Sequence, residues 1–164
     1  MPAKNPDSTA ISARSAQHAT FVIERNYDAT PTQVFAAWAT PQAKSRWFGG
    51  TAGKWKELER NFDFRVGGCE HLKGTWDGGT VSDFEAYYQD IVPDQRIVYT
   101  YDMHINDKRI SVSLSTVELK PTDKATHLIY TEQAVFLDGY DDAESRERGT
   151  RELLDKLTTA LQPQ

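Results

Sequence analysis

Alternating hydrophobic and polar positions run through most of the chain and predict strands. The pattern starts at Thr20 with TFVIERNYD and returns between residues 54 and 136 in KWKELER, NFDFRV, CEHLKGTW, FEAYYQDIV, RIVYTYDMHI, ISVSLSTVEL and THLIYTEQAVF. Short connectors such as DGG, VPDQ and INDK separate these segments. Because connectors of this length join antiparallel neighbours, we expect one antiparallel sheet with hairpin connections.

Helical spacing occurs directly after the first strand and again at the end of the chain. In ATPTQVFAAWATP, Thr30 can cap a helix that begins at Pro31, and PQAKSRWF predicts a second short helix. The last segment, 143–162, is amphipathic, and its leucines share one side: Leu153, Leu154, Leu157 and Leu161. We expect this long helix to lie across the apolar face of a curved sheet and to leave space between the two.

Composition and charge argue against several classes of function. The formal net charge is −5 and no basic run occurs, which argues against a nucleic-acid partner. No stretch approaches the roughly 20 apolar residues of a membrane span. A single cysteine cannot form an internal disulfide, so we expect a cytoplasmic protein. The first eighteen residues are polar, which predicts a disordered tail at 1–18 and a single domain at 19–164.

The stretch DFRVGGCEHL raises the question of a catalytic or metal site at Cys69-Glu70-His71. Two adjacent glycines inside a strand typically mark a bulge or a bend. A thiolate–imidazole pair also needs oxyanion donors, and the sequence does not supply them as a set. The remaining histidines have no metal-ligand spacing. We therefore expect Gly67-Gly68 to bend the sheet, and we expect neither a metal nor another cofactor.

Three ordered motifs resemble one known family. YDATPTQVFAAWATPQAKSRWFGG (27–50), FDFRVGG (62–68) and IVPDQRIVYTY (91–101) are similar to the AHSA-type domain, the bacterial homologues of an activator of a heat-shock-protein ATPase. This family belongs to the SRPBCC superfamily, whose fold is also called START-like or birch-pollen-allergen-like. The resemblance implies an α+β helix-grip fold, in which a curved antiparallel sheet wraps around a long C-terminal helix and encloses a hydrophobic cavity.

The resemblance does not imply a reaction, because cyclases, lipid carriers and chaperone cofactors share this scaffold. The chain also departs from the family at Thr150, near the position of a tryptophan that the last helix often carries. This difference would alter the floor of the cavity.

Every second position of the predicted strands supplies the candidate cavity wall. Inward tyrosines suggest hydrogen-bonding points in apolar surroundings, a mixture typical of small-molecule pockets. Together with two aromatic residues that the family places beside the cavity mouth, the predicted ligand-binding residues are Trp47, Phe48, Phe64, Trp76, Tyr99, Tyr101, Val112, Leu114, Tyr130, Glu132, Phe136 and Leu153.

Glu132 is the one carboxylate on the inward parity of its strand, and an inward carboxylate must be paired, hydrogen-bonded or protonated. It is our candidate catalytic residue, as a general base toward a ligand. It could equally pair with Arg146 or Arg151 of the last helix, or face solvent if the parity is reversed.

Three functions follow as hypotheses. The first is binding of a small hydrophobic molecule, aromatic or acyl and lipid-like, in the cavity between sheet and helix. The second is a cyclase, dehydratase or hydrolase acting on such a ligand, and the third is a module that binds a chaperone. A strand edge near KWKELER could also pair with a second copy to form a homodimer.

Overall fold

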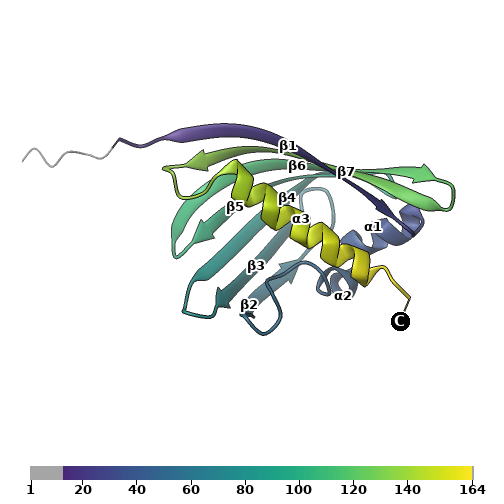
Figure 1. Ribbon diagram of the computed structural model, residues 1–164, viewed down its shortest axis with the longest axis horizontal. Coiled ribbons are helices and arrows are strands. Elements are labelled where there is room, and N and C mark those ends of the chain that lie inside the picture. The colour runs from purple at the N-terminus through teal and green to yellow at the C-terminus, as the bar shows by residue number, and fades with distance from the viewer. Residues whose placement is uncertain (1–12, 164) are drawn as a thin grey trace, which may run out of the picture.

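The computed structural model of the protein describes residues 13–163 and contains one seven-stranded antiparallel sheet in the order β1-β7-β6-β5-β4-β3-β2 (Figure 1). The strands are β1 (Ala16–Tyr27), β2 (Trp55–Phe62), β3 (Cys69–Trp76), β4 (Val81–Val92), β5 (Arg96–Ile105), β6 (Lys108–Thr122) and β7 (Ala125–Leu137). Strands β2 to β7 pair with their neighbours in the sequence, so their connections are the short turns that the sequence predicts. Strand β1 pairs with β7 and forms one edge of the sheet, and β2 forms the other edge.

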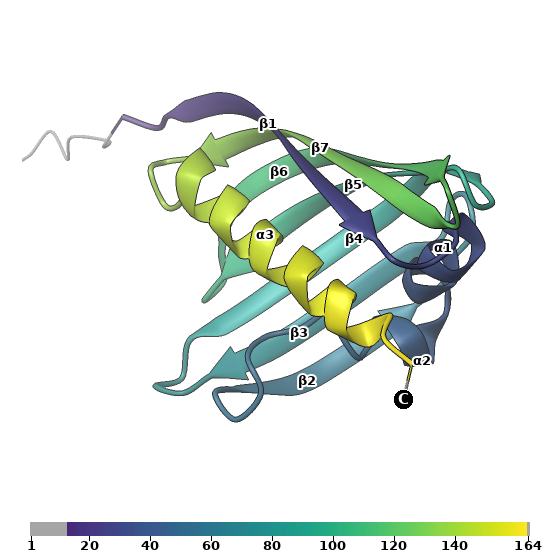
Figure 2. The same ribbon diagram turned by 45° about the vertical axis from the view of Figure 1, so that its right-hand side comes forward.

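Two short helices follow β1, as expected. Helix α1 (Pro31–Ala39) has Thr30 as its N-cap and Pro31 at its first position, and Thr30 and Gln33 form a capping box. Helix α2 (Pro41–Lys44) follows at once, since Pro41 cannot continue α1. The two helices close one end of the curved sheet (Figure 2).

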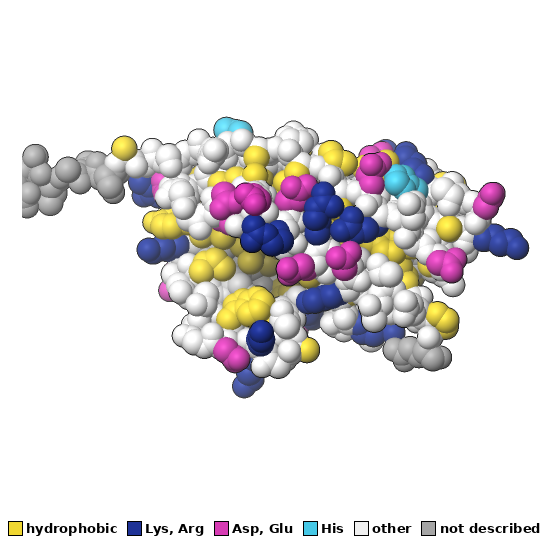
Figure 3. Space-filling view, viewed as in Figure 1, with side chains coloured by type: hydrophobic (Ala, Val, Ile, Leu, Met, Phe, Trp, Pro, Cys, Tyr) yellow, Lys and Arg dark blue, Asp and Glu magenta, His cyan; other side chains and the backbone are white. Residues whose placement is uncertain are grey.

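Helix α3 (Ala143–Ala160) runs diagonally across the concave face of the sheet (Figures 1 and 2). Asp142 caps its N-terminus by accepting a hydrogen bond from the Ser145 N–H at 2.9 Å. Leu154 and Leu157 are buried against the sheet, while the charged face of the helix points to solvent (Figure 3). This arrangement confirms the helix-grip fold that the sequence predicts.

The structure corrects the boundaries of three predicted elements. Strand β1 begins at Ala16, inside the segment expected to be a disordered tail, and the rest of that prediction, residues 1–12, lies outside the described residues. KWKELER and NFDFRV are not two strands, because β2 continues to Phe62 and residues 63–68 form a turn. The two glycines lie in this turn and not within a strand. Gly67 has φ 82°, a conformation that other residues rarely adopt.

The inward orientation expected for Val112 and Leu114 is wrong. Strand β6 turns its serines to the concave face, where Ser111, Ser113 and Ser115 are buried, whereas Leu114 is exposed. The register explains this result, because Ser115 lies opposite Glu132 of β7, and directly paired residues share a face. The serines are buried because the concave face carries acceptors and donors for their hydroxyl groups.

Candidate ligand-binding cavity

A cavity of about 370 Å³ lies between α3 and the concave face of the sheet. Its wall combines side chains from α1, the loop after α2, strands β2 to β5, strand β7 and one side of α3. This volume is within the range of pockets that hold small organic ligands. Polar contacts hold α3 near both of its ends, since Arg146 pairs with Glu132 of β7 and Lys156 donates to the loop after α2.

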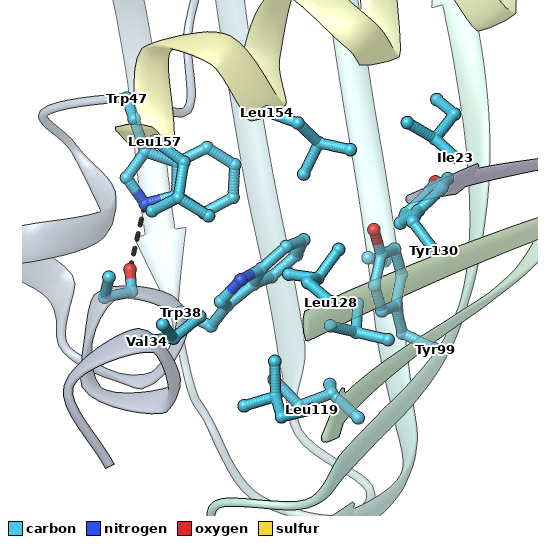
Figure 4. Close-up of a cluster of buried hydrophobic side chains, with 14 of the residues drawn as sticks. Ile23, Val34, Trp38, Trp47, Tyr99, Leu119, Leu128, Tyr130, Leu154 and Leu157 are labelled. Carbon is cyan, nitrogen blue, oxygen red and sulfur yellow. Dashed lines mark hydrogen bonds between the residues drawn. The ribbon is translucent and has the colours of Figure 1, made fainter. Parts of the chain in front are cut away.

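Aromatic rings form the end of the cavity beside α1 and α2. The rings of Trp38 and Trp47 meet edge to face with centroids 4.7 Å apart, and Phe48 meets Phe84 in the same way at 4.9 Å. The Trp47 indole N–H donates to the Ala37 carbonyl at 3.0 Å, which fixes the orientation of that ring (Figure 4). Leu154 of α3 points toward Trp38 and Tyr99 from the opposite side (Figure 4).

Trp55 of β2 lies on the sheet in a place that two glycines leave open. A Cβ atom on Gly74 would lie 2.0 Å from Trp55 Cε2, and a Cβ atom on Gly50 would lie 2.2 Å from Trp55 Cγ. Both contacts are far below van der Waals distance, so the indole occupies the space of the missing side chains. Trp55, Gly50 and Gly74 therefore act together to place an aromatic surface at the cavity.

Lys156 of α3 holds the loop after α2 at the edge of the cavity. Its ammonium group donates to the carbonyl oxygens of Gly49 at 2.9 Å and Gly50 at 3.3 Å. Burial lowers the pKa of Lys156. Figure 3 shows hydrophobic side chains beside the charged face of α3, on the side where β3 lies. Trp76, Met103 and Ile105 of the cavity wall are partly exposed.

Glu132 is fully buried behind the cavity wall, where four side chains donate to it. Tyr130 donates to Oε1 at 2.6 Å, and Tyr101 and Ser113 donate to Oε2 at 2.8 Å each. Arg146 of α3 completes the set with an ion pair of 3.3 Å to Oε2. All four groups around Glu132 are donors, and its two oxygens act only as acceptors. The ion pair confirms the pairing with Arg146, which the sequence offered as one alternative.

Arg146 lies on the cavity wall and connects the helix to three strands. Besides Glu132, its Nη1 atom donates to the Tyr101 hydroxyl at 2.9 Å, and its Nη2 atom donates to Ser111 at 2.6 Å and to Asp141 at 3.1 Å. The Phe136 ring lies 5.3 Å from the guanidinium carbon and stacks against it. The Nε–H of Arg146 donates to none of the described residues.

The protonation of this cluster follows from burial and charge. Burial raises the pKa of Tyr101 and of Tyr130 well above the ordinary tyrosine value, and the nearby charge of Glu132 raises both further. Burial alone would lower the pKa of Arg146, but Tyr101, Glu132 and Asp141 together raise it above its ordinary value. The tyrosines are therefore hydrogen-bond donors at neutral pH, and Arg146 is a cation.

A second buried ion pair lies beneath the aromatic end. The Lys44 ammonium group is 2.5 Å from Glu70 Oε1 and 3.2 Å from the Tyr88 hydroxyl, and both charged side chains are almost fully buried. The ammonium group also lies 4.6 Å from the centroid of Phe48. Burial lowers the pKa of Lys44, and the negative charge of Glu70 partly offsets this decrease. The pair fixes α2 on β3 and so positions Phe48.

Seven of the predicted ligand-binding residues lie on the cavity wall: Trp47, Phe48, Trp76, Tyr99, Tyr101, Tyr130 and Leu153. Their role toward a ligand stays a prediction.

Five predicted residues lie elsewhere. Phe64 stacks on Phe62 and contacts Tyr88, beyond the aromatic end, because the turn at 63–68 carries it away from the sheet. Phe136 is covered by Arg146, and Glu132 is covered by its donors. Val112 and Leu114 face away from the cavity because of the register of β6.

Sequence reasoning missed several residues of the site. Lys44 reads as a surface lysine of a short helix, and nothing local predicts its burial. The sequence suggests Arg146 only as a partner of Glu132 and not as part of the wall. The signal for Trp55 was present, because Gly74 is an isolated glycine inside a strand pattern, which often marks close approach of another group. Thr150, which lies near the position where the resemblance implies a tryptophan, lines the cavity.

The Cys69-Glu70-His71 stretch is divided between two faces of β3. Glu70 points inward to Lys44, whereas His71 contacts Asp83 at 2.5 Å on the other face. Burial raises the pKa of the Cys69 thiol, which disfavours the reactive thiolate. Within residues 13–163, no group of three or more histidine, cysteine, aspartate or glutamate side chains could hold a metal ion. None of the helices described is long and apolar enough to cross a membrane.

Comparison with known proteins identifies the family. The chain is 46% identical to the Mll3558 protein of Rhizobium loti, with a TM-score of 0.82 over 89% of this chain and 99% of that chain. It is 44% identical to an uncharacterized protein of Rhizobium leguminosarum, with a TM-score of 0.87 over 92% and 98% of the two chains.

An AHSA1-like protein of Aeromonas hydrophila shares the fold, with 17% identity and a TM-score of 0.68 over 87% of this chain and 92% of that chain. No protein with a curated description matches the sequence. The sequence model of the family described as activator of Hsp90 ATPase homolog 1-like protein matches residues 28–162. The chain therefore belongs to the AHSA1 family.

Proposed function

We propose that the protein binds a small, largely aromatic molecule in the cavity between α3 and the sheet. The observation that carries this proposal is the composition of the wall, in which aromatic rings surround about 370 Å³ of space and buried polar groups occupy one side. Ligand pockets combine an apolar surface with a few fixed polar groups in this way. The AHSA1 fold is consistent with ligand binding, and the choice of ligand is our inference from the wall.

Several features favour a flat ring over a flexible acyl chain. Trp38, Trp47 and Trp55 present planar surfaces, and hydrogen bonds or close packing hold two of them in place. A preformed aromatic wall offers an aromatic ligand stacked and edge-to-face contacts without reorganisation. An acyl chain would gain less from these rings and would lose more conformational freedom on binding.

The geometry gives the enzymatic alternative less support than the binding function. Glu132 was the candidate base, but its oxygens face Tyr101, Ser113, Tyr130 and Arg146, and it is not part of the cavity wall. A general base must come within hydrogen-bond distance of the proton it removes. Glu132 therefore supports the wall and is not placed to touch a ligand. Chaperone binding, a homodimer formed through the edge strand β2 and a cytoplasmic location remain predictions.

Native mass spectrometry of freshly purified protein, followed by a thermal-shift screen of an aromatic fragment library, tests the binding function. A ligand at one hundred times its Kd should stabilise the protein by about 2.7 kcal/mol. The alternatives give different results, because an enzyme would release a changed product and a chaperone partner would bind equally well when the cavity is filled. A library that contains no stabilising compound, together with an apo mass, would contradict the proposal.

A further inference from the structure

The charges around the cavity indicate which kind of ligand it can hold, an inference that rests on the proposed binding function. Four charged side chains belong to the wall, the cations Arg146 and Lys156 and the anions Asp141 and Glu152. Glu132 adds a third anion directly behind the wall, 3.3 Å from Arg146. The site therefore carries one more negative than positive charge before any ligand binds.

Of the two cations on the wall, Lys156 donates to carbonyl oxygens at the cavity edge, whereas Arg146 is the buried cation and is already paired with carboxylates. Two carboxylates pair with it, Glu132 at 3.3 Å and Asp141 at 3.1 Å. Its side chain is only 11% exposed, so water screens these interactions weakly. A ligand carboxylate placed against Arg146 would lie beside two like charges in a region of low dielectric, and it would also lose its own hydration.

One donor of Arg146 stays available. Both Nη atoms donate to protein acceptors, whereas the Nε–H donates to none of the described residues. Among the described residues, Trp38 Nε1 is the one fully buried side-chain nitrogen or oxygen without a hydrogen-bond partner. The Arg146 Nε atom also has no partner, so it is not fully buried. Because Arg146 belongs to the cavity wall, we infer that this N–H can donate one hydrogen bond to a ligand there.

We propose that the cavity selects an uncharged aromatic molecule with a hydrogen-bond acceptor, such as a ketone, and rejects the corresponding carboxylate. The acceptor binds the Nε–H of Arg146, and the aromatic part lies among the tryptophan and phenylalanine rings. An aromatic hydrocarbon of the same shape binds more weakly than the ketone, because it leaves this donor unpaired.

Equilibrium dialysis with three probes of similar shape tests this selectivity: 2-acetonaphthone as the neutral acceptor, 2-naphthoate as the anion and 2-ethylnaphthalene as the hydrocarbon. The ketone is expected to bind more tightly than the naphthoate by about tenfold or more, because the like charges oppose the anion. Naphthoate that binds as tightly as the ketone would overturn the inference and leave the binding function intact. Failure of all three probes to bind would count against the binding function as well.

A pair of charge variants tests the cause of the selectivity. Asp141→Asn keeps an acceptor for Arg146 but removes one charge, so naphthoate should bind about tenfold more tightly while the ketone is unchanged. Asp155→Asn removes the same charge from the exposed face of α3, where Asp155 pairs with Arg25, and should change neither affinity. An unchanged naphthoate affinity in Asp141→Asn would show that the charge cluster does not set the selectivity.

Discussion

Glu132 of β7 and Arg146 of α3 form an ion pair of 3.3 Å that joins the helix to the sheet at one end of the cavity. At the other end, Lys156 of the same helix donates to the carbonyl oxygens of the loop after α2. These polar contacts join α3 to β7 and to the loop after α2 at two points ten residues apart in the sequence. Between these two points the cavity lies on one side of α3, while Leu154 packs against the sheet.

Glu132→Gln should destabilise the protein without any ligand present. The substitution leaves Arg146 with one charged partner in a buried place, and breaking a buried pair of this kind costs about 3–5 kcal/mol. Urea unfolding followed by circular dichroism measures the free energy of unfolding. The matched control is Glu24→Gln, which alters an exposed hydrogen-bond contact with His127 and should cost less than about 1 kcal/mol. Equal losses for the two variants would contradict the buried pairing.

Alkaline pH should unfold the protein abruptly. Burial raises the pKa of five tyrosines above the ordinary value of about 10: Tyr27, Tyr88, Tyr99, Tyr101 and Tyr130. Above that value the unfolded state loses these protons and the folded state keeps them. The stabilisation is therefore complete below about pH 10 and is lost as the pH rises further, by about 1.4 kcal/mol per pH unit for each tyrosine.

Absorbance at the tyrosinate band and circular dichroism, recorded along one pH titration, check this prediction. The buried tyrosines should ionise together with the loss of the fold. Lys44 acts in the opposite sense, because burial lowers its pKa, but its effect ends near the ordinary lysine value. Ionisation of all tyrosines near pH 10 in a protein that stays folded would contradict the burial of these hydroxyl groups.

The sequence predicted the fold well because its periodicity and its motifs agree. Alternation located the strands, the capping residues Thr30 and Pro31 located α1, and the leucine side of 143–162 located the inner face of α3. The residues of the cavity wall were harder to predict than the fold, because the prediction placed apolar residues on the concave face and hydroxyl residues on the outer face. On β6 this rule fails, since Ser113 and Ser115 are the buried partners of Glu132 and Tyr130.

Long-range pairing explains the other misses. The burial of Lys44 depends on Glu70, which lies 26 residues away, and no local pattern connects the two. Phe64 has the spacing of a strand residue, but Gly67 and Gly68 turn the chain before the next strand begins. Sequence periodicity describes one element at a time, whereas these residues are placed by contacts between elements.

Two glycine variants test the placement of Trp55. Gly74→Ala puts a methyl group 2.0 Å from Trp55 Cε2, so the indole must move and the protein should lose about 1–3 kcal/mol. Gly149→Ala, in the middle of α3, meets nothing within 4 Å and should gain up to about 1 kcal/mol from helix propensity. Denaturation curves of the two variants measure both changes. A Gly74→Ala variant as stable as the parent protein would place Trp55 elsewhere.

Lys156→Met should speed ligand exchange. The methionine keeps most of the aliphatic stem but cannot donate to the carbonyl oxygens of Gly49 and Gly50, so the loop at the cavity edge opens more readily. Stopped-flow quenching of tryptophan fluorescence should show that association and dissociation both become faster, with a smaller change in Kd. Lys54→Met, an exposed lysine near the same loop, is the control and should leave both rates unchanged. Rates that are equal in the two variants would exclude this loop as the access route.

Filling the cavity tests its role as the binding site most directly. Leu153 lies on the cavity wall and Thr158 is exposed on the same helix, so Leu153→Trp and Thr158→Trp add the same side chain in two different places. The measurement is the affinity of both variants, by calorimetry, for the strongest binder from the fragment library. We predict a loss of affinity of more than about tenfold for Leu153→Trp and none for Thr158→Trp. Unchanged affinity in a folded Leu153→Trp variant would contradict binding in the cavity.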